Sequence, residues 1–514
     1  MAIHLWFLIH LLLILLSTIS VSSNVFVSIN CGASGSYTDE NSIAWTGDAD
    51  LISNGVPHTV QSNYSISPLY DTLRAFTTRR KNCYSIEAEE GGKVLVRVVF
   101  NYGNYDGKST PPMFDLHLDG NFWVTVNTSQ AIYYEAIYVV KRKVISICVA
   151  QTNPNQFPFI SSLEVRSVDP RAYNHIGPNY ALFRNIRNGY GLNETIRFPT
   201  DPYDRVWNDV NIGNGLRRVV NDASFINANT SSNPPQAVLK SAITPVNDTD
   251  FISLGLDTIA YPFHYPMYIN FYFIEVKQLN ATETRSFRIY IDAVPFSLPI
   301  VPHFGNATEY FISNLSVTAD TSFHIVGTGG SMLSPLLSAI EIFSISNALN
   351  NGTNNSDVEG LISLQKAFDV LQEWGGDPCL PAPYSWDWIK CNNDSVPRVT
   401  SLNLNSFNLS GRLPDFRNMD ALEIIDLHNN SLTGPVPDFL GTMLNLKQLN
   451  LADNQFSGSI PRSLSRNSQL ILSDTGNPLL CTNVTSCTRS SSNKKKTIKF
   501  STILTIIIPV FFIF

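Results

Sequence analysis

A pattern of about 24 residues repeats three times near the C-terminal end of the chain. The units begin with VTSLNL at 399–404, LEIIDL at 422–427 and LKQLNL at 446–451, and a fourth fragment starts at Leu470. Each unit continues with an apolar residue, a spacer and a glycine, and then with an aliphatic residue followed by proline. Leucines at fixed places in such a period predict units that stack around a shared apolar core.

These positions identify a leucine-rich repeat. Asn430 and Asn454 occupy equivalent places, where a side-chain amide satisfies backbone groups at a bend, whereas the first unit has Phe407 there. Three units are close to the minimum for a stable solenoid, so we expect caps. The short strands should line one face that suits contact with a peptide or protein, although a solvated face without a partner explains it equally well. Its variable positions are Thr400, Ser401, Asn403, Glu423, Ile424, Asp426, Lys447, Gln448 and Asn450.

Residues 25–345 are predicted to be β-structure, because short runs rich in β-branched and aromatic residues are bounded by Gly, Asn, Asp and Pro. Three segments recur in the same order at offsets of 173, 173 and 177 residues. The pairs are VRVVF (96–100) with INFYF (269–273), FDLHLD (114–119) with FRIYID (287–292), and SLEVRSV (162–168) with AIEIFSI (339–345). We therefore expect two tandem β-sandwiches with a seam near 169–178.

A polar, Asn-rich linker at 347–357 precedes one predicted helix. Asp357 is a good N-cap, and the two glycines after Trp374 are expected to end the helix. Apolar residues recur at spacings of three and four on one face, namely Leu361, Leu364, Phe368 and Leu371.

Both ends of the chain carry apolar runs. Leu5–Leu16 is followed by small residues up to Ser23, which is typical of a secretory signal peptide, and the run is shorter than the ~20 residues of a membrane span. Residues 500–514 form a second run, preceded by small residues at 490–493 and a basic stretch. We interpret this end as either a GPI-anchor signal or the start of a spanning helix. Either way, the membrane is met only at this end and the body lies outside the cell.

Fourteen Asn-x-Ser/Thr acceptors fit a glycosylated protein of the secretory pathway, facing out from the plasma membrane. The predicted glycosylation sites are Asn63, Asn127, Asn193, Asn229, Asn247, Asn280, Asn306, Asn314, Asn351, Asn354, Asn393, Asn408, Asn429 and Asn483.

The seven cysteines match no zinc pattern, and in an oxidising compartment near neighbours are expected to form bridges. We predict one disulfide between Cys379 and Cys391 and another between Cys481 and Cys487. Three cysteines are left, of which one must stay unpaired, and the sequence does not say which. They are Cys31, Cys83 and Cys148.

Composition argues against several classes of protein. A net charge of −7 argues against a general nucleic-acid binder, and a chain with 11% aromatic and only 15% charged residues is not disordered. The sequence has no GxSxG, HExxH, Walker A or GxGxxG motif, so we expect no enzyme, no cofactor and no metal site. Asp201 and Asp204 are weak candidates for the paired carboxylates of a glycosidase, for which turns or ion pairs are the favoured alternative.

Five motifs are spread over the chain from 29 to 391. They are INCG (29–32), FNYGNYDG (100–107), DPYDRVW (201–207), SAIEI (338–342) and GDPC (376–379) with Trp386 and Cys391. Together they resemble the ectodomain of plant malectin-like leucine-rich repeat receptor kinases. No kinase motifs follow, so the resemblance implies a kinase-lacking receptor-like protein or co-receptor that signals by joining a receptor kinase ectodomain.

Malectin is an animal lectin for a glucose disaccharide, so the resemblance also implies carbohydrate binding without supplying the site. Sugar C–H faces stack on aromatic rings, while amides and carboxylates bind the hydroxyl groups. Loop aromatics beside Asn and Asp therefore give the expected ligand-binding residues, Tyr102, Asn104, Tyr105, Asp106 and Trp123. The alternative is that Tyr102 and Tyr105 only pack the edge of the sandwich.

We therefore expect a mostly β protein of tandem malectin-like sandwiches, a capping helix and a short α/β repeat solenoid. The predicted segments are a signal peptide (1–23), sandwich 1 (24–172), sandwich 2 (173–346), a linker (347–357), an N-terminal repeat cap (358–397), repeats with a C-terminal cap (398–487), a basic stalk (488–499) and the apolar tail (500–514). The expected function is binding of a carbohydrate, a partner receptor ectodomain or both. The alternative is a cell-wall glycoside hydrolase or a structural extracellular glycoprotein.

Overall fold

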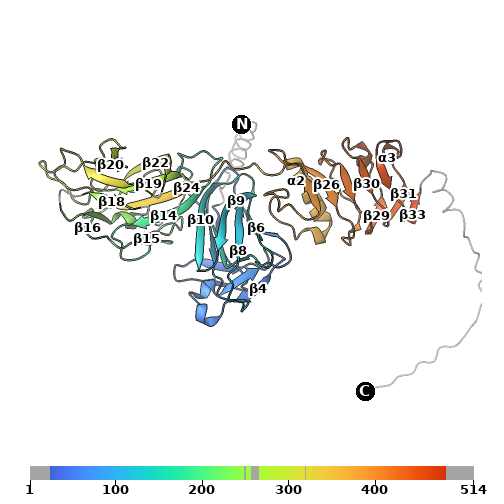
Figure 1. Ribbon diagram of the computed structural model, residues 1–514, viewed down its shortest axis with the longest axis horizontal. Coiled ribbons are helices and arrows are strands. Elements are labelled where there is room, and N and C mark those ends of the chain that lie inside the picture. Colours follow the sequence, from blue (N-terminus) through green and yellow to red (C-terminus); the bar gives the residue numbers. More distant parts are fainter. Residues whose placement is uncertain (1–23, 248–250, 256–264, 319, 482–514) are drawn as a thin grey trace, which may run out of the picture. The chain divides into compact units, whose positions relative to one another are not determined.

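The computed structural model describes residues 24–247, 251–255, 265–318 and 320–481 (Figure 1). The predicted signal peptide, the tail at 500–514 and Cys487 lie outside these residues. Contacts divide the chain into two compact units. The first comprises the chain up to Asn354 together with Gln372–Arg398, and the second comprises Asn355–Leu371 together with the chain from Val399. The segment predicted to be the repeat cap, 358–397, is thus split between the units.

A single large sheet runs through the first unit. Its strands lie in the order β2 (Ser36–Thr38), β3 (Ala44–Gly47), β1 (Phe26–Asn30), β13 (Ser162–Ser167), β7 (Lys93–Phe100), β10 (Ile132–Val139), β14 (Leu182–Gly189), β24 (Ala339–Ile345), β19 (Tyr265–Phe273) and β22 (Thr308–Val317), with β15 (Asn208–Asp209) beside β14. In this sheet, the strands from β2 to β10 belong to the first half of the β-rich unit and those from β14 to β22 belong to its second half. The two halves meet at β10 and β14, where only Ala136–Phe183 and Ile137–Leu182 are paired.

A smaller sheet faces each half of the large one. In the first half it contains β6 (Lys81–Glu87), β11 (Val144–Ala150), β8 (Met113–Leu118) and β9 (Asn121–Asn127). In the second half it contains β18 (Ile252–Leu254), β23 (Phe323–Gly327), β20 (Phe287–Ile291) and β21 (Val294–Pro295). Two shorter sheets are formed by β12 (Phe159–Ile160), β5 (Thr72–Ala75) and β4 (Val56–Thr59), and by β16 (Leu216–Val220) and β17 (Ser241–Pro245).

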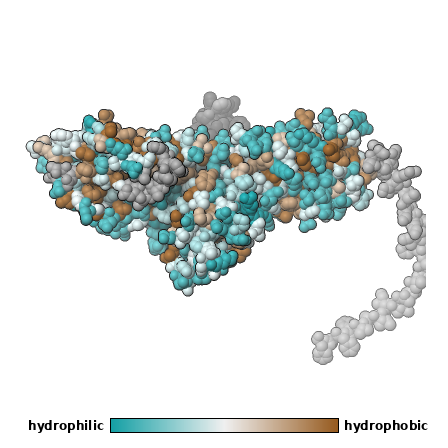
Figure 2. All heavy atoms as spheres, in the orientation of Figure 1, coloured by the Kyte–Doolittle hydropathy of each residue, from teal (hydrophilic) through white to brown (hydrophobic). Residues whose placement is uncertain are grey.

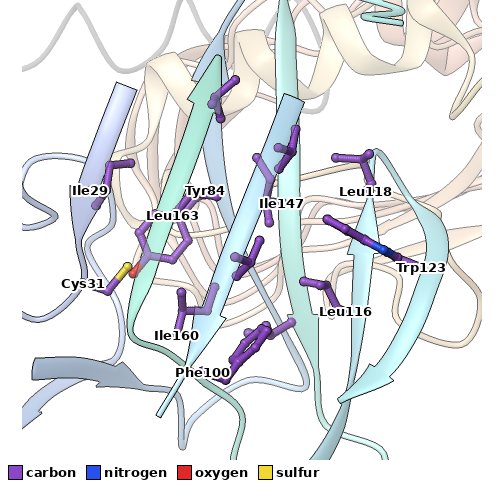
Figure 3. Close-up of a cluster of buried hydrophobic side chains, with 14 of the residues drawn as sticks. Ile29, Cys31, Tyr84, Phe100, Leu116, Leu118, Trp123, Ile147, Ile160 and Leu163 are labelled. Carbon is purple, nitrogen blue, oxygen red and sulfur yellow. The ribbon is translucent and has the colours of Figure 1, made fainter. Parts of the chain in front are cut away.

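The core of the first half lies between its two sheets. Because side chains alternate along a strand, Val94, Val96 and Val98 of β7 face this core. Figure 3 shows Leu116, Leu118 and Trp123 of the smaller sheet in the same cluster. The second half has an equivalent core of aliphatic and phenylalanine side chains from both of its sheets.

The recurring sequence segments correspond to equivalent strands. The first pair lies on β7 and β19, the second on β8 and β20, and the third on β13 and β24. In the first half β13 lies between β1 and β7, and in the second half β24 lies between β14 and β19. The recurring segments therefore mark two copies of one strand topology, and the two copies share one continuous large sheet.

The other face of the large sheet buries a network of arginines and carboxylates. Arg97 on β7 contacts Glu135 at 2.8 Å and Glu164 at 2.9 Å. Arg187 on β14 contacts Glu135 at 2.5 Å and Glu341 at 2.6 Å. All five side chains are almost fully buried, and the network crosses the junction between the halves.

The second unit begins with α2 (Asn355–Ala367) and the 3-10 turn η4 (Asp369–Leu371). The helix begins two residues before the predicted cap and ends well before the two glycines. Asp357 therefore lies inside the first turn, where its carboxylate accepts a hydrogen bond from the Val399 backbone N–H at 2.9 Å. The four apolar residues predicted for one face are buried.

The repeats form two parallel ladders of short strands. One contains β26 (Val399–Asn403), β28 (Ile424–Asp426), β30 (Gln448–Asn450) and β32 (Ile471–Ser473). The other contains β27 (Ser410–Gly411), β29 (Ser431–Pro435), β31 (Gln455–Ser459) and β33 (Leu479–Cys481), and the connections include the helical turns η5 (Asp438–Thr442) and α3 (Arg462–Ser465).

Asparagines join successive repeats as the sequence predicts. The Asn430 side-chain oxygen accepts the Leu409 backbone N–H at 2.9 Å, and the Asn454 oxygen accepts that of Leu432 at 3.0 Å. Asn477 continues the ladder by accepting the Phe456 N–H at 3.0 Å, a contribution of the fourth fragment that the repeat pattern did not reveal.

The structure settles the three remaining cysteines. Cys83 and Cys148 form a disulfide between β6 and β11, and Cys31 is a buried free thiol. Its sulfur lies against the hydroxyl end of the Tyr84 side chain in Figure 3. Cys379 and Cys391 are also bonded to each other, whereas the predicted Cys481–Cys487 pair involves a residue outside the described chain.

The part of the chain that the structure describes has no helix both long and apolar enough to cross a membrane.

Candidate functional site

A pocket of about 400 Å³ lies among the loops of the first half of the β-rich unit. Its walls come from the 3-10 turn η1 (Ser62–Tyr64), the loop between β7 and β8, and the connection between β9 and β10. The lining residues are Asn63, Tyr64, Ser65, Ile66, Asn101, Tyr102, Gly103, Asn104, Ser109, Pro111, Thr128, Ser129, Gln130 and Ala131.

The pocket wall at 101–104 has a conformation that requires glycine. Gly103 has a φ of +48°, and a Cβ atom there would lie 2.3 Å from the Val60 Cβ. The Gly103 carbonyl accepts the Gln61 backbone N–H at 2.9 Å, and the Asn104 amide donates to the Gln61 side chain at 3.0 Å. The two walls are therefore held together before any ligand binds.

Two of the predicted ligand-binding residues, Tyr102 and Asn104, line this pocket. The Tyr102 ring is only 7% exposed, and its hydroxyl donates to Asp106 at 2.5 Å. Desolvation and the Asp106 carboxylate raise the pKa of Tyr102 to about 12, so the hydroxyl remains a donor. The Asn104 side-chain oxygen accepts the Ser109 N–H at 2.8 Å. Both residues mainly hold the loop in shape.

The other three predicted residues are not part of the lining. The Tyr105 ring lies 4.9 Å from His58 and 5.7 Å from Phe159, where it packs against the core. Asp106 accepts the hydrogen bond of the Tyr102 hydroxyl. The Trp123 ring is buried and stacks on Phe183 at 5.5 Å. The fold thus brings only two of the five predicted ligand-binding residues to this pocket.

Sequence reasoning missed Tyr64 and Ile66, which are 46% and 58% exposed and line the pocket. Tyr64 offers the accessible aromatic ring that Tyr102 does not. Its only signal in the sequence is an aromatic residue inside the polar stretch QSNYS, and its position opposite the 101–111 loop follows from the fold.

All fourteen lining residues are uncharged at neutral pH. The Ser129 hydroxyl and the Gln130 amide share the lining with the Tyr64 ring and Ile66. Such a lining can exchange hydrogen bonds with hydroxyl groups and cover an apolar face. It provides no carboxylate pair for acid–base cleavage of a glycosidic bond.

The two weak candidates for glycosidase carboxylates serve the buried network instead. Asp204 binds Arg197 at 2.9 Å and Arg166 at 3.0 Å, and Asp201 accepts from Arg205 and the Trp207 indole, both at 2.8 Å. Burial opposes ionisation of Asp204, but Arg97 and the other arginines outweigh it and lower the pKa of this carboxylate. Both carboxylates are fully buried, so neither is open to a substrate.

The predicted binding face of the repeats is a sheet of β26, β28, β30 and β32. Lys447 pairs with Glu423 at 2.8 Å across two repeats. Asp426 accepts from His428 at 2.7 Å, and the Asn450 amide lies 3.2 Å from the same His428 nitrogen. Among the nine predicted positions Ser401 is buried, and the others are half-buried or exposed. Figure 2 shows largely hydrophilic residues on the visible face of this unit.

The described chain thus combines facing β-sheets that carry an uncharged loop pocket with a unit of stacked repeats. The chain belongs to the malectin-like domain family, which matches residues 29–345. Leucine-rich repeats match at 421–443 and 445–467.

Curated proteins from Arabidopsis thaliana are similar in sequence to most of this chain. The probable LRR receptor-like serine/threonine-protein kinase At1g67720 is 34% identical over 86% of this chain and 49% of its own length. The uncharacterized protein At1g24485 is 34% identical over 67% of this chain and 69% of its own length. The chain spans about half the length of the kinase relatives that it matches.

Solved structures share the fold. The ANX2 ectodomain from Arabidopsis thaliana superposes with a TM-score of 0.53 at 18% identity, covering 63% of this chain and 97% of that one. A chain from the complex of the plant peptide RALF23 with FER and LLG2 gives a TM-score of 0.52 at 17% identity, covering 63% and 96%.

Proposed function

We propose that this protein is an extracellular binding protein that holds a neutral carbohydrate in the loop pocket of its β-rich unit. The observation that carries the proposal is the uncharged lining, in which the exposed Tyr64 ring lies among side-chain amides and hydroxyls. Membership of the malectin-like family supports the same class of ligand. The volume of about 400 Å³ is suited to one or two sugar rings.

The roles within the pocket divide between recognition and support. Tyr64 is proposed to stack on a sugar face, while Ser129 and Gln130 exchange hydrogen bonds with hydroxyl groups. Tyr102 and Asn104 are proposed to fix the loop rather than to supply the stacking surface. An uncharged site favours a neutral glycan over an acidic one, because a buried carboxylate without a cation loses solvation that nothing restores.

The test is glycan-array binding of the purified chain, followed by titration of the best ligand. Tyr64→Ala should weaken binding roughly five- to tenfold, since an aromatic face contributes about 1 kcal/mol. This change keeps the Asn63-Tyr64-Ser65 acceptor usable, because its middle position tolerates alanine. The matched control is Tyr180→Ala, which removes a tyrosine that is 41% exposed outside the pocket. Equal affinity of wild type and Tyr64→Ala would contradict the assignment.

The same preparation separates binding from catalysis. A bound oligosaccharide should be recovered intact after prolonged incubation. Release of reducing sugar by the purified chain would favour the glycoside hydrolase alternative, and failure to bind any glycan would favour a structural or protein-docking role.

A second function is proposed for the repeats, namely docking of a partner receptor ectodomain. The supporting observation is the row of half-buried and exposed polar positions along β26, β28 and β30. A solved chain of related fold comes from the complex of the plant peptide RALF23 with FER and LLG2. Reversing the charges of Glu423 and Lys447 together keeps their ion pair but changes the surface. Loss of a co-purifying receptor kinase in this variant would support docking here.

We also propose that the chain is secreted and tethered through its C-terminal tail. Release from membranes by a phosphatidylinositol-specific phospholipase would establish a GPI anchor. Retention after this treatment, with Phe514 still present, would indicate a membrane-spanning tail.

A further inference from the structure

The large sheet of the first unit ends in a long strand. β22 has ten residues and pairs with β19 on one side (Figure 1). Across the described ranges, no strand pairs with its other side. At the opposite end of the sheet the last strand, β2, has only three residues. Half of the backbone N–H and C=O groups of β22 therefore point away from the sheet.

The sequence of this edge favours pairing with another strand. TEYFISNLSV contains one charged residue, Glu309, and neither lysine nor proline. Its aromatic and β-branched residues have high β-propensity, and Phe311 is 38% exposed. Proteins commonly protect such an edge with charges or proline, because an open edge recruits a second chain.

One irregularity interrupts the strand. Met267 of β19 pairs with Leu315 and Tyr268 pairs with Ser313, so Asn314 has no counterpart and forms a bulge. Its φ is +58°, in the left-handed region that asparagine tolerates better than most residues. The Asn314 side chain is exposed and makes no hydrogen bond with any residue of the described chain.

Asn314 also begins the acceptor triplet Asn314-Leu315-Ser316. An N-linked glycan is bulky and hydrated, and adjacent strands lie only about 4.8 Å apart. A glycan rooted at the bulge would therefore occupy the space that an added strand needs. Asn306, near the start of the strand, differs because its side-chain oxygen accepts a hydrogen bond from Asn227 at 3.1 Å.

We propose that an N-linked glycan on Asn314 closes the free edge of β22 against pairing with a second copy of this chain. Without the glycan, two β22 edges pair antiparallel about a two-fold axis, because the same surface then meets itself. The bulge alone weakens this pairing locally but leaves several residues on each side of Asn314 available. The inference rests on the proposed extracellular location, since glycosylation requires the secretory pathway.

The test removes the glycan without removing the asparagine. The full chain is expressed in plant cells as wild type, Ser316→Ala and Thr282→Ala. Ser316→Ala keeps Asn314 in its bulge and abolishes only the acceptor, and Thr282→Ala removes the acceptor at Asn280 in an exposed loop. Peptide mass spectrometry measures the occupancy of each site, and light scattering measures the molar mass of the purified chain.

We expect occupied Asn314 in the wild type, a doubled protein mass for Ser316→Ala at micromolar concentration, and a monomeric Thr282→Ala variant. Adding Ser313→Lys to Ser316→Ala should restore the monomer, because like charges then meet across the paired edges. A Ser316→Ala chain that lacks the glycan and remains monomeric would overturn the inference. So would a bare Asn314 in a chain whose other acceptors are occupied, whereas a chain without any glycan would overturn the proposed location itself.

Discussion

Neighbouring aromatic residues on β9 illustrate how burial decides the role of a side chain. Phe122 and Trp123 are adjacent in the sequence, but strand alternation turns them to opposite faces of the sheet. Trp123 is 6% exposed and lies in the core, whereas Phe122 is 55% exposed. A tryptophan beside a turn looked like a binding residue in the sequence, and only the fold shows that it packs.

This difference predicts unequal costs of truncation. Trp123→Ala should lower the free energy of unfolding by roughly 3–5 kcal/mol, because it leaves a cavity beside Phe183. Phe122→Ala serves as the matched control and should cost less than about 1 kcal/mol. Urea denaturation of both variants checks the prediction. Equal destabilisation by the two changes would contradict the placement of Trp123 in the core.

Asp119, in the turn before β9, is half-buried, and no cation of the described chain lies within ion-pair distance of its carboxylate. It accepts the Ser146 backbone N–H at 2.6 Å and the Tyr138 hydroxyl at 2.8 Å. Desolvation outweighs these hydrogen bonds and raises its pKa from 3.8 to about 6. The folded state therefore binds this proton more tightly than the unfolded state does.

A pH dependence of stability follows. The stabilisation that Asp119 adds to the folded state is complete below about pH 4 and is lost as the pH rises to about 6. The free energy of unfolding changes by about 3 kcal/mol over this range. Asp119→Asn should remove this part of the pH dependence between pH 4 and 7. Asp50→Asn, which removes a carboxylate at an exposed position, is the control. Identical profiles for wild type and Asp119→Asn would contradict the prediction.

At the scale of elements, asparagine ladders replace sheet hydrogen bonds where the repeats bend. Besides accepting the Leu432 N–H, Asn454 donates to the carbonyls of Leu427 and Leu451 at 2.9 and 3.3 Å. One buried amide thus holds two consecutive repeats. A substitution leaves several backbone groups buried and unpaired, and this is more costly than the loss of one exposed hydrogen bond.

Asn454→Ala should therefore destabilise the repeat unit by roughly 2–4 kcal/mol. The control is Asn445→Ala, since the Asn445 side chain is exposed and donates only to the Asp420 carbonyl at 2.8 Å. Hydrogen exchange of amides in β28 and β30 reports the local effect. Unchanged protection of these strands in Asn454→Ala would show that the ladder does not hold the repeats.

At the scale of the whole molecule, charged groups connect the two halves of the β-rich unit. The halves share only two paired positions between β10 and β14, but Glu135 of β10 reaches both Arg97 and Arg187. Burial disfavours ionised Glu135, yet Arg187 and Arg97 outweigh it and lower its pKa to about 2. The junction is thus held by buried ion pairs, and removing one charge destabilises the fold because its partner stays buried without compensation.

Glu135→Gln should lower the free energy of unfolding at pH 7 by roughly 3–5 kcal/mol, because it leaves arginine charge buried without compensation. The wild type should lose its advantage as the pH falls from about 4.5 towards 2, where Glu135 takes up a proton. Glu87→Gln, at an exposed position of β6, is the control. A difference between wild type and Glu135→Gln that does not change with pH would contradict this account.

The sequence by itself determined the repeats, the β-rich region and its internal duplication, because stacking and strand alternation impose periods that adjacent residues display. It also predicted the Cys379–Cys391 bridge from proximity along the chain. It could not assign Cys83 to Cys148, reveal that the two halves share one sheet, or place Tyr64 across from the 101–111 loop. These features join residues far apart in the chain, and only tertiary packing decides which of them become neighbours.

The fold likewise decided which of the five predicted ligand-binding residues line the pocket. The composition of a loop indicates which chemistry is available, and this chemistry is the same for Tyr102 and Tyr64. Exposure depends on what packs against each ring, since Tyr102 is enclosed by the core and its own loop while Tyr64 remains open. Local sequence thus determined the kinds of groups present, and long-range contacts determined which of them a ligand can reach.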